Sequence, residues 1–306
     1  MKTIHHPLTA ADATVVASLR QAMSAQKGKY MGTGARQPFE AQKNGVQPAD
    51  CQTTPGVVGG VSGWWCHPAN PRPDAALIYY HGGWYMLGTA ESFRNQASHY
   101  AVRTRTSTFV PDYRRAPEAP FPAAYDDALA VYLDMSKQDG RKIALVGDSV
   151  GGALSLLVLA AAAAKPDLVQ RPLGAVAMSP VTDLTLSSAS MQTRAQADPI
   201  FTRDMVANFV EAYLDGADAK DPRASPLYGP LEGLPPVLID VGEDEILLDD
   251  AVRYAERATD QGVDVTLGIW AGMPHTFPGL IGKLAAATEA VSAECNFLNT
   301  LLDAAG

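Results

Sequence analysis

Short apolar segments alternate with longer amphipathic ones through most of the chain. The apolar runs are rich in β-branched and aromatic residues and have the length of buried strands. The predicted strands are Ala76–Tyr80, Ser107–Val110, Lys142–Val146, Leu173–Met178, Val237–Val241 and Val263–Trp270. The predicted helices are Pro122–Ser136, Gly151–Ala164, Arg203–Leu214, Asp249–Gln261 and Lys283–Leu302. This alternation predicts an α/β fold with a mostly parallel central sheet flanked by helices.

Three segments depart from the alternation. Gly56–Cys66 has the pattern of an antiparallel hairpin at the start of the sheet. Residues 1–50 are expected to form helix and polar loop without a strand, and residues 184–222 to form a Ser-rich loop and a helix. We predict that these two segments form a helical cap, because open α/β sheets bind ligands at the carboxyl ends of their strands. Residues 51–183 and 223–306 then form the core. The alternative is that both segments only decorate the surface.

Composition narrows the class of protein. The 306 residues are 47% hydrophobic and 19% charged, as in folded globular proteins. A net charge of −9 without a basic patch argues against a nucleic-acid partner. The longest apolar stretch, Ala153–Ala164, is too short to span a membrane, and the N-terminus lacks the apolar run of a secretory signal.

Three cysteines, Cys51, Cys66 and Cys295, are an odd number without metal-site spacing. We therefore expect buried thiols in a cytoplasmic protein, rather than a disulfide framework or a zinc site. Nothing in the sequence implies a metal or an organic cofactor.

The pentapeptide Gly147-Asp148-Ser149-Val150-Gly151 matches the pattern G-x-S-x-G. It lies between a predicted strand and a predicted helix, which is the context of a nucleophile elbow. Small residues permit the sharp turn, and the helix N-terminus places positive potential beside developing negative charge. A phosphate-binding loop would instead need a lysine after the glycines. Ser149 is therefore the candidate nucleophile.

A serine nucleophile requires a base, and His275 is the best placed of six histidines. It follows Val263–Trp270 in a loop at the predicted carboxyl edge of the sheet. His5 and His6 are expected to be disordered or on the surface. His67 is expected in a turn and His99 on a helix, each with a structural or solvent role.

An acid and an oxyanion hole complete the expected chemistry. Glu243, Asp244 and Glu245 follow Val237–Val241, so the chain order is serine, acid, histidine. The residues alone leave open which carboxylate serves. Gly82 and Gly83, which follow Ala76–Tyr80, can present unobstructed amides to one oxygen together with Val150. The alternative for the two glycines is a simple tight turn.

Several motifs together resemble those of the bacterial hormone-sensitive-lipase-like esterases (family IV), a branch of the α/β-hydrolase fold. The resemblance runs from about Ala76 to Phe277, roughly two thirds of the chain. The motifs are HGGW at 81–84, DYRRAPEAPFPAAYDD at 112–127, GDSVGG at 147–152, SPVTDLT at 179–185, GEDEILLDD at 242–250 and GMPHTF at 272–277.

The resemblance implies roles for particular residues. It favours Glu245 as the acid, because Glu245 to Asp249 fits the family frame D-P-L-x-D, with Asp244 as the alternative. It assigns Gly82, Gly83 and Val150 to the oxyanion hole and the two irregular segments to a helical cap. Trp84 stands where the family usually has a third glycine, which predicts a small substrate pocket.

The implied activity is that of a carboxylesterase acting on short-chain acyl esters through an acyl-enzyme. A lactonase or an arylformamidase-like amidase on the same residues is the alternative. A ligand-binding receptor, like the plant gibberellin receptors of this fold, is disfavoured because those lack the working histidine. The expected partner is a small-molecule ester, and a homodimer through Lys283–Leu302 or an edge strand Val263–Trp270 is possible.

Overall fold

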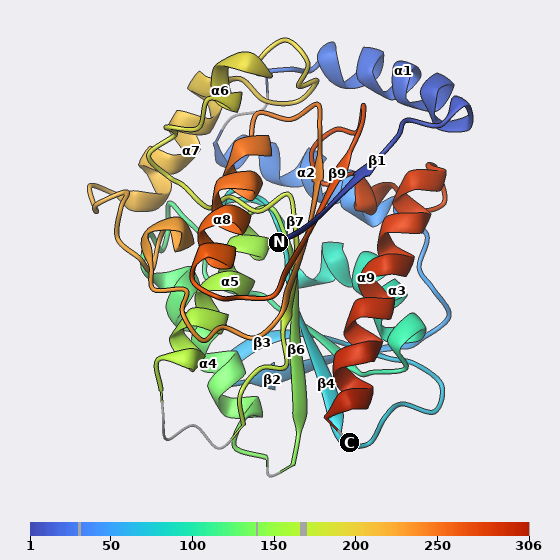
Figure 1. Ribbon diagram of the computed structural model, residues 1–306, viewed down its shortest axis with the longest axis vertical. Coiled ribbons are helices and arrows are strands. Elements are labelled where there is room, and N and C mark those ends of the chain that lie inside the picture. Colours follow the sequence, from blue (N-terminus) through green and yellow to red (C-terminus); the bar gives the residue numbers. More distant parts are fainter. Residues whose placement is uncertain (30–31, 139, 166–169, 306) are drawn as a thin grey trace.

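The computed structural model describes residues 1–29, 32–138, 140–165 and 170–305. In that part of the chain, nine strands form one sheet with helices on both faces (Figure 1). The strands are β1 Lys2–His6, β2 Gln52–Val58, β3 Val61–His67, β4 Ala75–Tyr80, β5 Thr108–Pro111, β6 Lys142–Asp148, β7 Ala175–Met178, β8 Val237–Gly242 and β9 Val265–Trp270. The α-helices are α1 Ala10–Ser24, α2 Arg36–Asn44, α3 Ala90–Thr104, α4 Ala123–Met135, α5 Val150–Ala163, α6 Ser190–Thr193, α7 Arg203–Leu214, α8 Leu248–Asp260 and α9 Ala285–Ala304. Short 3-10 turns occur at Thr33–Ala35, Pro226–Tyr228 and Phe277–Leu280.

The strand order is β1-β9-β8-β7-β6-β4-β5-β3-β2. In this order every neighbouring pair from β1 to β5 is parallel, whereas β3 pairs antiparallel with both β5 and β2. Gly59 and Gly60, both at positive φ, make the tight turn between β2 and β3. The predicted α/β fold with a mostly parallel sheet and an antiparallel hairpin is confirmed.

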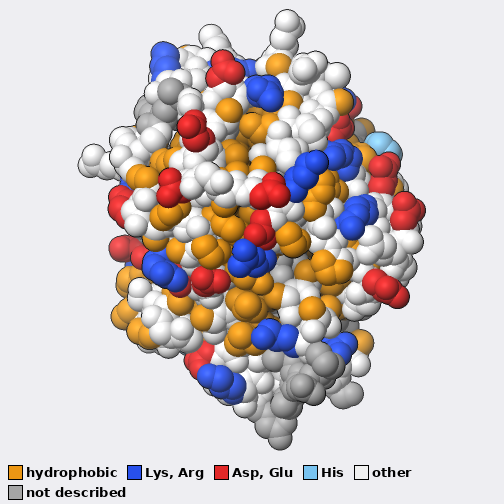
Figure 2. All heavy atoms as spheres, turned by 90° about the vertical axis from the view of Figure 1, so that its left-hand side faces the viewer, with side chains coloured by type: hydrophobic (Ala, Val, Ile, Leu, Met, Phe, Trp, Pro, Cys, Tyr) orange, Lys and Arg blue, Asp and Glu red, His pale blue; other side chains and the backbone are white. Residues whose placement is uncertain are grey.

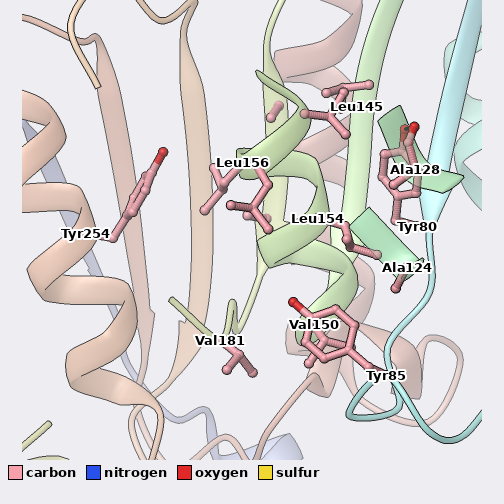
Figure 3. Close-up of a cluster of buried hydrophobic side chains, with 14 of the residues drawn as sticks. Tyr80, Tyr85, Ala124, Ala128, Leu145, Val150, Leu154, Leu156, Val181 and Tyr254 are labelled. Carbon is pink, nitrogen blue, oxygen red and sulfur yellow. Dashed lines mark hydrogen bonds between the residues drawn. The ribbon is translucent and has the colours of Figure 1, made fainter. Parts of the chain in front are cut away.

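The central strand β4 is buried on both faces. Ile78 and Tyr80 join the core under α4, α5 and α8, while Leu77 and Tyr79 join the core under α3 and α9. Figure 3 shows α5 lying between Tyr80 of β4 and Tyr254 of α8. Full burial explains why β4 is an uninterrupted apolar run rather than an alternating one.

The N-terminus corrects one expectation about the sheet. Residues 1–50 contain a strand, β1, which pairs in parallel with β9, with Lys2 opposite Thr266 and His6 opposite Trp270. The prediction of no strand there is therefore wrong, and β9 is not an edge strand. The ring of His6 stacks on Trp270 at 3.6 Å between centroids, whereas His5 is exposed. The strand is short and mostly polar, so its sequence lacks the apolar signal of the other strands.

The other histidines and the cysteines are structural. His67 ends β3, not a turn, and its ring bonds to Thr54 and Ser107, while His99 lies on α3 as expected. All three cysteines are free thiols, and Cys51 is only partly buried. None of the helices within the described ranges has the length and apolarity that crossing a lipid bilayer requires.

The face over α4 and α7 mixes apolar side chains with charges of both signs (Figure 2). No continuous basic patch appears on this face, in keeping with the net charge of −9. A phosphate backbone would therefore find no basic footprint on it.

Two acids are buried together between β8 and α9. Asp240 Oδ1 accepts a hydrogen bond from Trp270 Nε1 at 2.7 Å, and Tyr100 donates its hydroxyl to Glu294 Oε2. Each carboxyl group lies in the electrostatic field of the other, and one oxygen of each, Asp240 Oδ2 and Glu294 Oε1, has no hydrogen-bond partner among the described residues. Burial, with the neighbouring charge adding to it at Glu294, raises the pKa of both groups.

We expect Glu294→Gln to stabilise the protein at alkaline pH. The folded protein holds a carboxyl proton that the unfolded chain releases above the ordinary carboxyl range, so the free energy of unfolding falls as pH rises. Glutamine keeps an oxygen that can accept the hydroxyl of Tyr100 without that proton. Thermal unfolding should show a Tm for Glu294→Gln about 3–6 °C above wild type near pH 8.5. The gain should shrink near pH 5. A Tm difference that is the same at both pH values would contradict a raised pKa of the Glu294 carboxyl group in the folded protein.

Candidate active site

Ser149 lies at the turn between β6 and α5. Its backbone has φ 57° and ψ −123°, which is unusual for a residue other than glycine. A Cβ on Gly147 would lie 2.1 Å from the carbonyl oxygen of Gly151, and one on Gly151 would lie 2.0 Å from that of Tyr80. Both glycines are therefore required for the strand, the turn and the helix to approach this closely. The predicted strand-to-helix turn at Ser149 is present.

Glu245 and His275 form a buried pair at the carboxyl ends of β8 and β9. Glu245 Oε2 lies 2.6 Å from His275 Nδ1, and the Glu245 side chain has no exposed surface. The other oxygen, Oε1, accepts the hydroxyl of Ser179 at 2.8 Å and the amide of Gly242 at 2.7 Å. Ser179 Oγ also accepts the amide of Thr276 at 3.1 Å, so it holds both sides of the pair. Sequence reasoning did not single out Ser179, although it begins the motif SPVTDLT.

The neighbouring carboxylates point elsewhere. Asp244 Oδ2 forms an ion pair with Arg20 Nη1 of α1 at 2.5 Å. Glu243 pairs with Arg194 at 3.4 Å and is partly exposed. Glu245 is thus the carboxylate in contact with His275, and Asp244, the alternative, contacts the N-terminal segment.

A cavity of about 500 Å³ opens onto Ser149 and His275. Its lining is mostly apolar and combines the sheet edge with α1, α2 and α7, which are far apart in sequence. These helices contribute Leu19, Ala22, Met23, Phe39, Gln42, Lys43, Met205 and Phe209. No hydrogen bond joins Ser149 Oγ to the His275 ring among the described residues. Hydrogen bonds between catalytic groups are often long in a protein without substrate.

Known proteins share this architecture. Residues 77–279 match the family model of the alpha/beta hydrolase fold. The chain is 36% identical over 259 residues to an acetyl-hydrolase of Streptomyces hygroscopicus, covering 84% of each chain. It is 34% identical over 228 residues to an esterase of Acinetobacter venetianus, covering 74% of this chain and 75% of that one. A crystal structure of an esterase from the bacterial hormone-sensitive lipase family superposes with a TM-score of 0.88 at 32% identity. That superposition covers 96% of this chain and 99% of the other.

The chain belongs to the hormone-sensitive-lipase-like esterases of the α/β-hydrolase fold. It is accordingly an ester hydrolase.

Trp84 gives this esterase an aromatic wall inside the cavity. The residue is buried, and its ring stacks on Phe209 of α7 at 6.0 Å between centroids. Phe201 meets Trp84 edge-on at 5.4 Å and the His275 ring at 5.0 Å. An aromatic cluster thus joins the His275 ring to Trp84 at the wall of the cavity.

The amides after β4 differ from the sequence expectation. The amide of Gly82 donates to Asp148 Oδ1 at 3.1 Å, so it is already engaged, and Gly82 does not line the cavity. This argues against the prediction that Gly82 contributes to an oxyanion hole. Gly83 and Trp84 do line the cavity. Together with Val150, their amides have no acceptor in the described part of the esterase.

His81 is excluded as a base by its surroundings. It is fully buried, its Nδ1 lies 2.8 Å from the carbonyl oxygen of Gly82, and its ring stacks on Tyr113 at 4.3 Å. Burial lowers the pKa of His81 to about 4, so the ring is neutral at pH 7. His81 therefore has a structural role in the loop that follows β4.

Asp198 is a buried carboxylate that the sequence did not indicate. It accepts the amides of Ile200 and Phe201 at 2.7 and 2.9 Å. It also accepts the amide of Ile246, next to Glu245, at 2.9 Å. Asp198 thus fastens the segment before α7 to the loop that carries Glu245. Sequence spacing could not predict the role of Asp198, because its partner Ile246 lies 48 residues away.

We expect Gly151→Ala to disrupt the turn at Ser149 far more than Gly152→Ala. The new methyl group would collide with backbone atoms of Tyr80 and His81, which cannot move without shifting β4. At Gly152 the nearest atoms are 3.3 Å away, including the side chain of Pro180. Thermal unfolding of the two variants measures the difference, which should reach several kcal/mol. Equal stability of the two variants would contradict the close approach at Gly151.

Proposed function

We propose that this ester hydrolase cleaves short-chain acyl esters with Ser149 as nucleophile, His275 as base and Glu245 as the orienting acid. The observation that carries the proposal is the 2.6 Å contact between buried Glu245 and His275, beside the cavity that Ser149 also lines. A carboxylate on Nδ1 fixes the tautomer that leaves Nε2 free to accept a proton.

The reaction has two steps. Ser149 Oγ attacks the ester carbonyl while His275 Nε2 takes its proton, and the tetrahedral intermediate collapses as His275 protonates the departing alcohol. Water, deprotonated by the same nitrogen, then attacks the acyl-serine, and His275 returns the proton to Ser149 Oγ as the carboxylic acid leaves. Glu245 orients the ring through Nδ1 and stabilises the imidazolium.

The oxyanion requires donors that are not already used. The amides of Gly83, Trp84 and Val150 meet this condition, whereas that of Gly82 does not. We therefore retain Gly83 and Val150 from the sequence prediction and replace Gly82 with Trp84. Each such donor contributes about 3 kcal/mol to stabilising the transition state.

The segments predicted as a cap supply most of the substrate's surroundings. We propose that α1 and α2, from residues 1–50, and α6 and α7, from residues 184–222, form a cap over the site. Support comes from the share of α1, α2 and α7 in the cavity lining and from bonds of Arg20 and Lys27 to carbonyl oxygens of residues 195–198. β1 belongs to the sheet and not to this cap.

The two neighbouring carboxylates provide a matched test of the triad. Ser149→Ala should lower kcat for p-nitrophenyl butyrate about 10⁴- to 10⁶-fold, because the nucleophile is lost. Glu245→Gln should lower it about 10²- to 10⁴-fold, whereas Asp244→Asn should stay within about tenfold of wild type. Circular dichroism controls for folding. A larger loss in Asp244→Asn than in Glu245→Gln would overturn the assignment of the acid.

The acyl chain length tests the role of Trp84. Wild type should prefer acetyl to hexanoyl esters of p-nitrophenol, because the stacked Trp84 and Phe209 rings limit the cavity. Trp84→Leu removes one ring and should move the optimum toward longer chains by about two to four carbons, by the volume it frees. The kcat/KM series from C2 to C12 is the measurement. Preference of wild type for dodecanoyl esters would refute the short-chain proposal.

A further inference from the structure

The cavity contains a lysine that the ester chemistry does not use. Lys43 lies near the end of α2 and lines the cavity with Ser149. Its Nζ lies 4.7 Å from the centroid of the Phe93 ring and 5.6 Å from that of Phe39. The ammonium group is therefore held against two aromatic faces, a favourable but weak partner for a cation.

Among the described residues, Lys43 has no ion pair with a carboxylate. The single acidic residue in the cavity lining is Asp148. Its Oδ1 already accepts the hydroxyl of Tyr79 at 2.9 Å and the amide of Gly82 at 3.1 Å. Burial lowers the pKa of Lys43, and the charge of Asp148 offsets this only in part.

The cavity lining carries more positive than negative side chains, although a neutral ester has no charge for them to match. Lys43 and Lys283 both line it, against the one carboxylate of Asp148. The protein as a whole carries a charge of −9, so its overall field does not attract anions. A partly desolvated cation without a counter-ion costs free energy that a bound anion would recover.

We propose that Lys43 is a specificity-determining residue that binds a second, anionic group of the substrate. Resting on the proposed function, this assigns as preferred substrates esters whose acyl or alcohol part carries a free carboxylate. The apolar lining would hold the connecting carbons, and the ammonium would donate to the carboxylate oxygens. The scissile ester would remain at Ser149.

Two pairs of esters isolate the effect of a substrate carboxylate on hydrolysis. On the acyl side, the mono-p-nitrophenyl ester of glutaric acid and p-nitrophenyl pentanoate have the same chain length and differ in a terminal carboxylate. On the alcohol side, 4-carboxyphenyl butyrate and phenyl butyrate differ in the same way. The measured quantity is the ratio of kcat/KM within each pair. Comparing this ratio between wild type and a variant cancels the effect of the substitution on the chemical step.

Lys43→Met, a neutral side chain of similar length, should lower this ratio about 10- to 100-fold in at least one pair. That is the loss expected for one hydrogen bond to a charged group. The change should lie mainly in KM. Lys283→Met serves as the control, because it removes an equal charge from the same lining and should leave the ratio within about twofold, as expected for a screened charge. An unchanged ratio in Lys43→Met, or an equal fall in both variants, would overturn the proposal.

A binding measurement separates this proposal from the catalytic one. Monomethyl glutarate and methyl pentanoate can be titrated into Ser149→Ala, with and without Lys43→Met, by calorimetry. Tighter binding of monomethyl glutarate that is lost in Lys43→Met supports the subsite even if no ester is turned over. Turnover of pentanoate esters combined with equal binding of both ligands would leave the esterase function intact and refute the subsite.

Discussion

The carboxylate of Glu245 is removed from water completely, and a buried charge is tolerated only where its oxygens have partners. Those partners are the hydroxyl of Ser179, the amide of Gly242 and the ring of His275. They come from the ends of β7, β8 and β9, which are adjacent in the sheet. Removing one partner of a buried charge typically costs about 3–5 kcal/mol. The register of three parallel strands and the orientation of the histidine therefore depend on each other.

In the proposed mechanism, chemistry and substrate selection are carried by different parts of the chain. The proposed nucleophile, acid and base follow parallel strands, whose backbone is fixed by the sheet. The opposite walls of the cavity come from helices near the N-terminus and from α7. These walls are joined by Arg20, which bonds to both Asp244 and the carbonyl oxygen of Ala197. Substitutions in the walls can thus alter which ester fits without moving the reacting groups.

The sequence predicted those features that have a local signal. Buried strands such as β4 and β7 are continuous apolar runs, and the glycines on both sides of Ser149 indicate the tight turn there. β1 was missed because it is short and polar, and its partner β9 lies more than 250 residues away. The sequence could not indicate that the amide of Gly82 is occupied, because only the position of the Asp148 side chain shows it. Ser179, Asp198 and Lys43 were missed for the same reason, since one polar residue has no meaning until its distant contacts are known.

The pairing of β1 with β9 has a consequence for how copies of this protein could associate. The amides and carbonyls of β9 that face away from β8 are hydrogen-bonded to β1. A second molecule therefore cannot extend the sheet by adding a strand to β9. Five residues form that covering strand, and they are joined directly to the stretch that leads into α1. Exchange of β1 between two copies would preserve every hydrogen bond of the ladder and the stack of His6 on Trp270. β1 itself now forms this edge, so a strand from a second molecule could pair only with the outer side of β1, and exchange of β1 between copies is the domain-swapped alternative.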